Sequence, residues 1–189
     1  LIIGAKTSID LIDVSEYDPI MPGKKIKHVV DLVIIRASIG MKKDASYEKH
    51  VKTCKENGIP FSVYHYVKGN TVEKVRAEAE FFYRTAQKDH PTFFYADIEY
   101  GGIKNNKARE LMDGWLDVFE SKADKPRLGF YIANHRRRAM NLEENRVEVI
   151  WVPSYGENNG DWDGKTNPYD ACDLHQFGSL FYINCVARR

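Results

Sequence analysis

The stretch TFFYADIE, residues 92–99, reads as a buried β-strand that carries two acids near its end. Amphipathic helical patterns stand on both sides of it, over residues 71–88, with Thr71 as a candidate N-cap, and over residues 108–122. Strands that alternate with helices are typical of βαβ units, and a nearly continuous apolar run indicates a strand covered on both faces. This stretch therefore predicts an α/β fold with a mostly parallel sheet.

The same alternation extends along the chain. A further helix is expected over residues 46–58, closed by Gly58. Short apolar runs predict further strands at residues 9–15, 31–38, 61–67, 128–134, 147–153 and 173–177. This number of strands favours a compact (β/α) barrel, with an open doubly wound sheet as the alternative. No G-x-G-x-x-G or G-x-x-x-x-G-K-[ST] follows any strand, so the usual nucleotide sites of an open sheet are missing.

The charge composition of the chain indicates which kinds of binding partner to expect. The 189 residues fit one domain, and 28 basic against 27 acidic residues leave a net charge of +1. We therefore expect neither nucleic acid nor a membrane as a partner. The basic run HRRR, residues 135–138, is interpreted as a solvated helix start or loop, with contact to an anionic polymer as the alternative. No His, Cys, Asp and Glu set has metal-ligand spacing, so no metal site is expected.

Acids collect where the predicted strands end, which is the functional edge of a parallel barrel. Asp97 and Glu99 stand two positions apart, so on a strand they share a face, with Cα atoms about 6.6 Å apart. Asp13 arrives at the same edge from the first strand. Two like charges in a poorly solvated pocket separate their pKa values, and the group that keeps its proton can act as a general acid at a glycosidic oxygen. The alternative is a carboxylate pair that caps a helix or holds an arginine.

Aromatic side chains at the same strand ends favour a sugar ligand. Tyr and Trp faces stack on pyranose rings, and their polar tips bond hydroxyl groups. Such residues are Tyr64, Tyr131, Trp151 and Tyr155. The alternative for each of them is a place in the barrel core. His65 and His175 are interpreted as structural histidines rather than catalytic bases.

Five motifs follow one another along nearly the whole chain: IDVS (12–15), VIIRASIG (33–40), GIPFSVYHYV (58–67), YADIE (95–99) and DLHQF (173–177). Together they resemble the glycoside hydrolase family 25 lysozymes, muramidases of the Chalaropsis type that occur as phage endolysins and bacterial autolysins. The joint presence of D-V-S, Y-H-Y and D-x-E carries this resemblance.

The resemblance implies a flattened, TIM-like (β/α) barrel with incomplete helices in the second half, and residues 1–189 are expected to form a single catalytic domain. It implies hydrolysis of the β-1,4 bond between N-acetylmuramic acid and N-acetylglucosamine in peptidoglycan, without a cofactor. Glu99 would protonate the leaving oxygen. Asp97 would steady the 2-acetamido group or the positive charge at the anomeric carbon, and Asp13 would lie on the floor of the cleft. The residues implied to line the cleft are Tyr64, Tyr131, Trp151 and Gln176.

The sequence departs from the family pattern in three places. The pattern has another acid after the last strand, whereas this chain ends INCVARR, with Ala187 or a neighbour in that place. The aromatic-Gln pair after D-V-S is replaced by Glu16-Tyr17-Asp18, and Ile39 stands where an acid is frequent. These departures concern a fourth acid and the rim of the cleft, not the D-x-E pair.

The sequence thus leaves three hypotheses: a peptidoglycan muramidase, a glycan-binding barrel that has lost turnover, and a hydrolase of another N-acetylated glycan such as chitin. We favour the first. It predicts peptidoglycan glycan strands as the partner and a monomer that acts outside the cell or in the cell wall, secreted or released by a phage. No signal peptide is visible in the chain.

Overall fold

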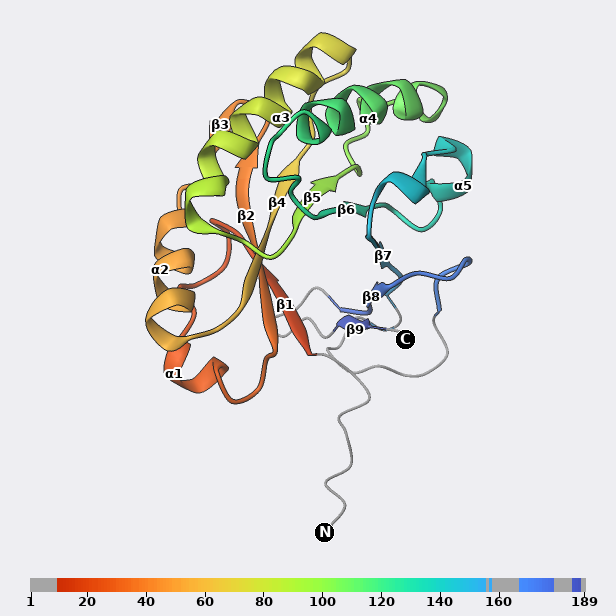
Figure 1. The fold of residues 1–189 in the computed structure, drawn as a ribbon. Coiled ribbons are helices and arrows are strands. Elements are labelled where there is room, and N and C mark those ends of the chain that lie inside the picture. Colours follow the sequence, from red (N-terminus) through yellow and green to blue (C-terminus); the bar gives the residue numbers. More distant parts are fainter. Residues whose placement is uncertain (1–9, 156, 158–166, 179–184, 188–189) are drawn as a thin grey trace.

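The fold is a single curled sheet with helices on its outer side (Figure 1). The computed structural model describes residues 10–155, 157, 167–178 and 185–187. Within these residues the sheet has nine strands. They are β1 (Leu11–Val14), β2 (Leu32–Ile39), β3 (Lys42–Lys43), β4 (Phe61–Tyr66), β5 (Phe94–Asp97), β6 (Leu128–Tyr131), β7 (Val149–Pro153), β8 (Leu174–Gln176) and β9 (Cys185–Ala187).

The strand order is β1-β2-β4-β5-β6-β7-β8-β9, with β3 paired to β2. The pairs β2–β3 and β8–β9 are antiparallel, and the other neighbours are parallel. Cα atoms of β9 come within 8 Å of those of β1, so the sheet curls back towards its first strand. The predicted flattened α/β barrel is confirmed.

Helices cover the barrel unevenly. In Figure 1 the three long helices lie along the outside of the β2–β6 half, and in the described residues after Glu120 no helix exceeds four residues. This confirms the incomplete helices of the second half. The helices are α1 (Gly23–Ile26), α2 (Tyr47–Asn57), α3 (Val72–Ala86), α4 (Asn105–Glu120) and α5 (Arg137–Met140), with 3₁₀ turns η1 (Gln87–Asp89) and η2 (Glu144–Arg146).

Local sequence explains where the long helices begin and end. The Thr71 hydroxyl accepts a hydrogen bond from the Lys74 amide at 3.3 Å and caps α3. Gly58 ends α2 at φ +63°, in the left-handed region that favours glycine. α4 begins at Asn105, three residues before the expected start, because residues 104–107 contain no apolar side chain for the helical periodicity to detect.

The two faces of the sheet bury different side chains. The outer face and the helices share a large apolar core, which includes Phe82 of α3 and Trp115 of α4. A smaller cluster fills the inside of the barrel, formed by every second residue of successive strands. Its buried members are Leu11, Ile34, Tyr64, Tyr95, Tyr131, Trp151 and Leu174.

Gly129 makes room for this inner cluster. It lies opposite Tyr95 across the β5–β6 pair, and a Cβ atom built on it would come within 2.3 Å of the Tyr95 ring. Tyr95 in turn packs edge-on against Trp151, with ring centroids 5.7 Å apart. A side chain at residue 129 would therefore displace the aromatic floor beneath the strand ends.

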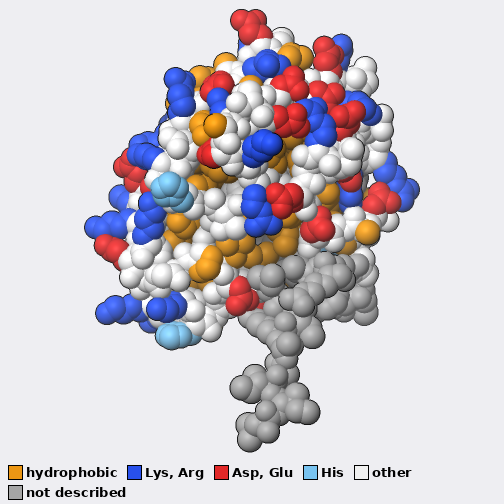
Figure 2. Space-filling model, viewed as in Figure 1, with side chains coloured by type: hydrophobic (Ala, Val, Ile, Leu, Met, Phe, Trp, Pro, Cys, Tyr) orange, Lys and Arg blue, Asp and Glu red, His pale blue; other side chains and the backbone are white. Residues whose placement is uncertain are grey.

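On the face of the molecule seen in Figure 2, no charge of one sign dominates. On the face seen in Figure 2, basic and acidic side chains are intermingled, with apolar atoms between them near the centre. No helix among the described residues is long and apolar enough to cross a membrane.

Candidate active site

Three acids meet at the carboxyl ends of the strands. Asp13 lies in β1, Asp97 is the last residue of β5, and Glu99 follows two residues later. The Gln176 amide, from β8, donates to Asp13 Oδ1 at 3.0 Å and so joins the last strands to the first. The sheet therefore brings together acids that are far apart in the sequence.

Asp97 is the buried member of the set, at 5% exposure. Its Oδ1 atom is buried and has no hydrogen-bond partner among the described residues. Burial raises the pKa of Asp97 well above its ordinary value, and the nearby charges of Glu99 and Asp13 raise it further. Such an oxygen is costly unless something binds it, so it is a natural contact for a ligand.

Glu99 differs from the expected picture of two acids on one buried strand. β5 ends at Asp97, and Glu99 lies in the loop that follows, with an exposed side chain. The surrounding protein still removes enough water from its carboxyl to raise its pKa. Glu99 is thus open to a substrate while it holds its proton more firmly than a free glutamate.

Asp13 is also shifted. Burial, followed by repulsion from Asp18, raises the pKa of Asp13 to about 7. All three acids therefore favour the protonated form more than isolated carboxyls do. The electrostatics of the free protein place the strongest preference for a proton on the buried Asp97, whereas the sequence reasoning kept the charge there and the proton on Glu99.

The predicted aromatic residues surround these acids. Trp151 packs edge-on against Tyr131 and Tyr64, with ring centroids 4.6 Å and 6.5 Å apart. The Tyr131 and Tyr155 hydroxyls lie 3.4 Å apart, and Tyr155 is 40% exposed. The Trp151 Nε1 and Gln176 Oε1 atoms are buried without a hydrogen-bond partner in the described part of the chain. The strand ends around the acids thus offer aromatic side chains, one unpartnered donor and one unpartnered acceptor.

Arg36 and Tyr66 are site residues that the sequence reasoning did not select. Arg36 is buried beside the acids, but its guanidinium donates to Asp44 at 2.7 Å and to Glu16 at 3.0 Å. These two carboxylates neutralise Arg36, so it lowers the pKa of Asp97 only in part. Burial, then Glu99 and Asp97, raise the pKa of Tyr66 to about 12. The alternation of side chains along β2 and β4 could have identified both residues. Arg36 and Tyr66 each stand two positions after an inward-facing residue, Ile34 and Tyr64.

The predicted histidines stay outside the site. His65 faces α3, where its Nδ1 lies 2.8 Å from the Ser38 hydroxyl and its Nε2 lies 3.1 Å from a Glu78 carboxylate oxygen. His175 Nε2 lies 2.9 Å from the Ser154 carbonyl oxygen. Across the described residues, no group of three His, Cys, Asp or Glu side chains is placed to hold a metal ion.

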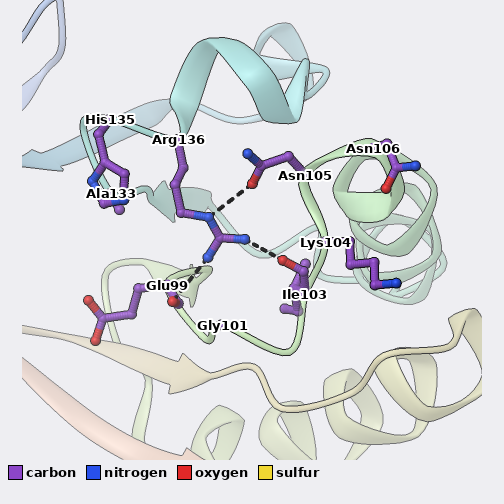
Figure 3. Close-up of a pocket in the computed structure, with 9 residues that line it drawn as sticks. All are labelled: Glu99, Gly101, Ile103, Lys104, Asn105, Asn106, Ala133, His135 and Arg136. Atoms are coloured by element: carbon purple, nitrogen blue, oxygen red, sulfur yellow. Dashed lines mark hydrogen bonds between the residues drawn. The ribbon is translucent and has the colours of Figure 1, made fainter.

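Arg136, from the segment after β6, holds the loop that carries Glu99. Its Nη1 donates to the carbonyl oxygens of Glu99 and Tyr100 at 3.0 Å and 3.3 Å, and its Nη2 donates to that of Ile103 (Figure 3). Its Nε donates to the Asn105 side chain at 3.0 Å. Arg136, the first arginine of HRRR, therefore links the segment after β6 to the segment after β5 through hydrogen bonds and is not simply a solvated charge.

The curled α/β sheet with acids and aromatic side chains at its carboxyl edge defines a barrel of the glycoside hydrolase class. The chain belongs to glycosyl hydrolases family 25, whose sequence model matches residues 12–184. A comparison with curated protein sequences gave no match.

Solved structures share this fold. The catalytic domain of endolysin ply40 from bacteriophage P40 of Listeria monocytogenes is 23% identical, with a TM-score of 0.85 over 98% of this chain and 95% of that chain. The glycosyl hydrolase 25 GHIP of Streptococcus pneumoniae is 20% identical, with a TM-score of 0.83 over 96% and 87%. A family 25 glycosyl hydrolase from Bacillus anthracis is 17% identical, with a TM-score of 0.70 over 96% and 89%. The barrel is thus common to proteins of widely diverged sequence.

Proposed function

We propose that the protein is a lysozyme, a 1,4-β-N-acetylmuramidase that hydrolyses the bond between N-acetylmuramic acid and N-acetylglucosamine in peptidoglycan. The meeting of Asp13, Asp97 and Glu99 at one barrel edge carries the proposal. Membership of family 25 supports glycoside hydrolysis. The structural neighbours include the autolysin LytC of Streptococcus pneumoniae, solved with a synthetic peptidoglycan ligand, which supports a cell-wall substrate.

Glu99 is the proposed general acid. Its carboxyl is accessible, and its raised pKa keeps a larger share of it protonated near neutral pH. The proton passes to the glycosidic oxygen as the bond from the anomeric carbon to that oxygen breaks. The positive charge that develops at the anomeric carbon is neutralised when water supplies the hydroxyl group of the new reducing end, and the remaining proton of that water returns Glu99 to its acid form.

Asp97 is the proposed partner of the 2-acetamido group, through its buried, unpartnered Oδ1. As a carboxylate it accepts a hydrogen bond from the acetamido N–H, and as an acid it donates one to the acetamido carbonyl. Asp13, fixed by Gln176 at 3.0 Å, adds a second carboxyl on the floor of the cleft. Both would favour positive charge at the anomeric carbon when ionised.

The aromatic wall is the proposed sugar-binding surface. Tyr64, Tyr131 and Trp151 present fixed rings, and Tyr155 extends the wall towards solvent. The unpartnered Trp151 Nε1 and Gln176 Oε1 would bond sugar hydroxyls or acetamido groups. We further propose that residues 1–189 act as one catalytic domain and a monomer, on peptidoglycan outside the cell or in the cell wall.

Analysis of new reducing ends tests this function. Purified peptidoglycan is digested, reduced with borohydride and separated by mass spectrometry. Muraminitol at the new ends is the expected result, and glucosaminitol would instead identify a glucosaminidase. Binding to walls without new reducing ends would favour the non-catalytic barrel, which the absence of an acid in Cys185–Ala187 motivates. Release of products from chitin oligosaccharides alone would point to another N-acetylated glycan.

A further inference from the structure

A groove opens beside the loop that carries Glu99. It has a volume of about 740 Å³ and lies between the segment after β5 and the segment after β6 (Figure 3). Glu99 lines one end of it and Lys104 the other, with Arg136 between them. The groove therefore runs from the loop that carries the proposed general acid to the start of α4.

The charge of this groove is positive and uncompensated. Arg136 gives its hydrogen bonds to carbonyl and amide oxygens, and in the described chain no carboxylate forms an ion pair with it. Lys104 is exposed and likewise makes no ion pair with a described residue. Glu99 is the only acid in the described lining, and its raised pKa reduces its negative charge.

This pattern contrasts with the other basic side chains nearby. Arg137 is paired with Glu144 at 2.7 Å, Arg138 with Asp170 at 2.7 Å and Lys107 with Glu110 at 3.0 Å. Lys104 and Arg136 thus differ from these three neighbours in having no ion pair with a described residue. Asn105 and Asn106 add amide groups to the same wall.

We propose that this groove binds the peptide stem of muramic acid through a stem carboxylate. The inference rests on the proposed muramidase function. The lactyl group that bears the stem is attached two carbons from the anomeric carbon, so a muramic ring cleaved at Glu99 carries its stem close to a groove that Glu99 lines. A peptide with a free carboxylate and several amides matches unpaired cations and Asn side chains.

The test compares substrates that differ by one charge. Soluble glycan oligomers are prepared with D-isoglutamate or with D-isoglutamine as the second stem residue, so that a carboxylate is exchanged for a carboxamide of the same shape. The wild-type protein should have a KM about two- to five-fold lower for the acid form at low salt, as expected for one exposed ion pair, and the preference should fade as salt rises.

Substitutions at Lys104 locate the effect. Lys104→Gln should bring the acid-to-amide preference close to one, and Lys104→Glu should invert it. Lys107→Gln removes the same charge one helical turn along α4, outside the groove lining, and should keep the wild-type preference. Equal KM values for both substrates in the wild-type protein, or an unchanged preference in Lys104→Glu, would overturn the proposal.

A binding experiment separates this proposal from the function on which it rests. Muramyl dipeptides with D-glutamate or D-isoglutamine are titrated into the protein and followed by NMR. If neither glycan is cleaved but the acid dipeptide binds more tightly and Lys104→Glu reverses the order, the muramidase function fails and the stem groove stands. If both glycans are cleaved without any acid preference in titration or kinetics, the muramidase function stands and the stem groove fails.

Discussion

The two faces of β4 and β5 treat buried polar groups in opposite ways. On the outer face, His65 is held by Ser38 and Glu78, and Glu78 also accepts from the Lys68 amide at 2.9 Å. On the inner face, Asp97 Oδ1 is buried with no partner among the described residues. The outer groups satisfy one another's hydrogen bonds and stabilise the fold, whereas the inner group is the one that we propose binds the substrate.

An unpartnered atom alone does not mark the site. Trp115 Nε1, in the helix-covered core, is as unpartnered as Trp151 Nε1 in the barrel mouth. The difference lies in what surrounds each atom, because Trp151 packs against Tyr64, Tyr95 and Tyr131 in the inner cluster, whereas Trp115 lies in the outer core. We therefore propose a binding role only for the unpartnered atom of the inner cluster.

The largest expected effect is the loss of activity on removing the acid at the mouth. Glu99→Gln should lower the rate of reducing-end release by about 10²–10⁴-fold, the usual contribution of a general acid. The melting temperature should stay close to the wild-type value, because the side chain is exposed. Glu110→Gln, on the exposed side of α4, is the matched control and should retain the wild-type rate. Wild-type lysis by Glu99→Gln would remove Glu99 from its role.

A change on the outer face of the sheet should lower stability and leave the activity of the folded protein unchanged. Glu78→Ala leaves His65 and the Lys68 amide without their acceptor, so the free energy of unfolding should fall by about 2–4 kcal/mol. The kcat of the folded fraction should not change. Denaturant unfolding measures the loss, with Glu80→Ala as the control, since its bond to Lys122 is exposed and worth at most about 1 kcal/mol. Similar losses in both variants would contradict the structural role of Glu78.

The inner acids should give stability a dependence on pH. The pKa of Asp13 is raised from 3.8 to about 7, so the folded state binds its proton more tightly than the unfolded state. This stabilisation is present at low pH and is lost as pH rises from about 4 to about 7. Asp13→Asn, which keeps an acceptor for Gln176, should therefore gain about 3 kcal/mol relative to the wild-type protein over that range, because a rise of one pKa unit corresponds to about 1.4 kcal/mol. Unfolding free energies measured at pH 4 and pH 7 check it, and a constant difference would contradict the shift.

The smallest expected effect compares the two tryptophans directly. Trp151→Phe removes the unpartnered indole donor of the inner cluster, which we propose bonds the substrate, and it should raise KM about two- to ten-fold, the value of one hydrogen bond. Trp115→Phe removes an equally unpartnered donor from the outer core and should leave KM unchanged. Steady-state kinetics on soluble glycan distinguishes them. Equal KM values in both variants would mean that the inner donor is not used by the substrate.

Much of the fold could be predicted because strand and helix periods are local. Each of these signals predicts only the segment in which it stands. The structure has β2 and β4 at the apolar runs of residues 31–38 and 61–67, and α3 begins after the cap at Thr71. The end of β5 was harder. A period of two continued through Glu99, but the strand stops at Asp97, so burial applies to one acid and not to the other.

The site could be predicted only where the alternation of a strand reached it. Tyr64 and Trp151 follow from that alternation, whereas the tie from Arg136 to the Glu99 loop spans 37 residues and depends on two loop conformations. Arg136 looked solvated because its partners are three backbone carbonyl oxygens and the side chain of Asn105, which no pattern of charges in the sequence reveals. The sequence also does not reveal that Asp44 and Glu16 neutralise Arg36, because these contacts depend on how the segments fold together.

Because helices cover the barrel unevenly, the strands on its two sides should differ in the free energy of local opening. β2, β4 and β5 are held between the inner cluster and long helices, so their amide hydrogens should exchange mainly through global unfolding. β7 and β8 have only the short α5 and η2 segments of described helix after β6 in the chain, so they should open at a lower free energy. The strands β7 and β8, which bear Trp151 and Gln176, can then move to admit a bulky, branched polymer. The strand β5, which bears Asp97, keeps its geometry.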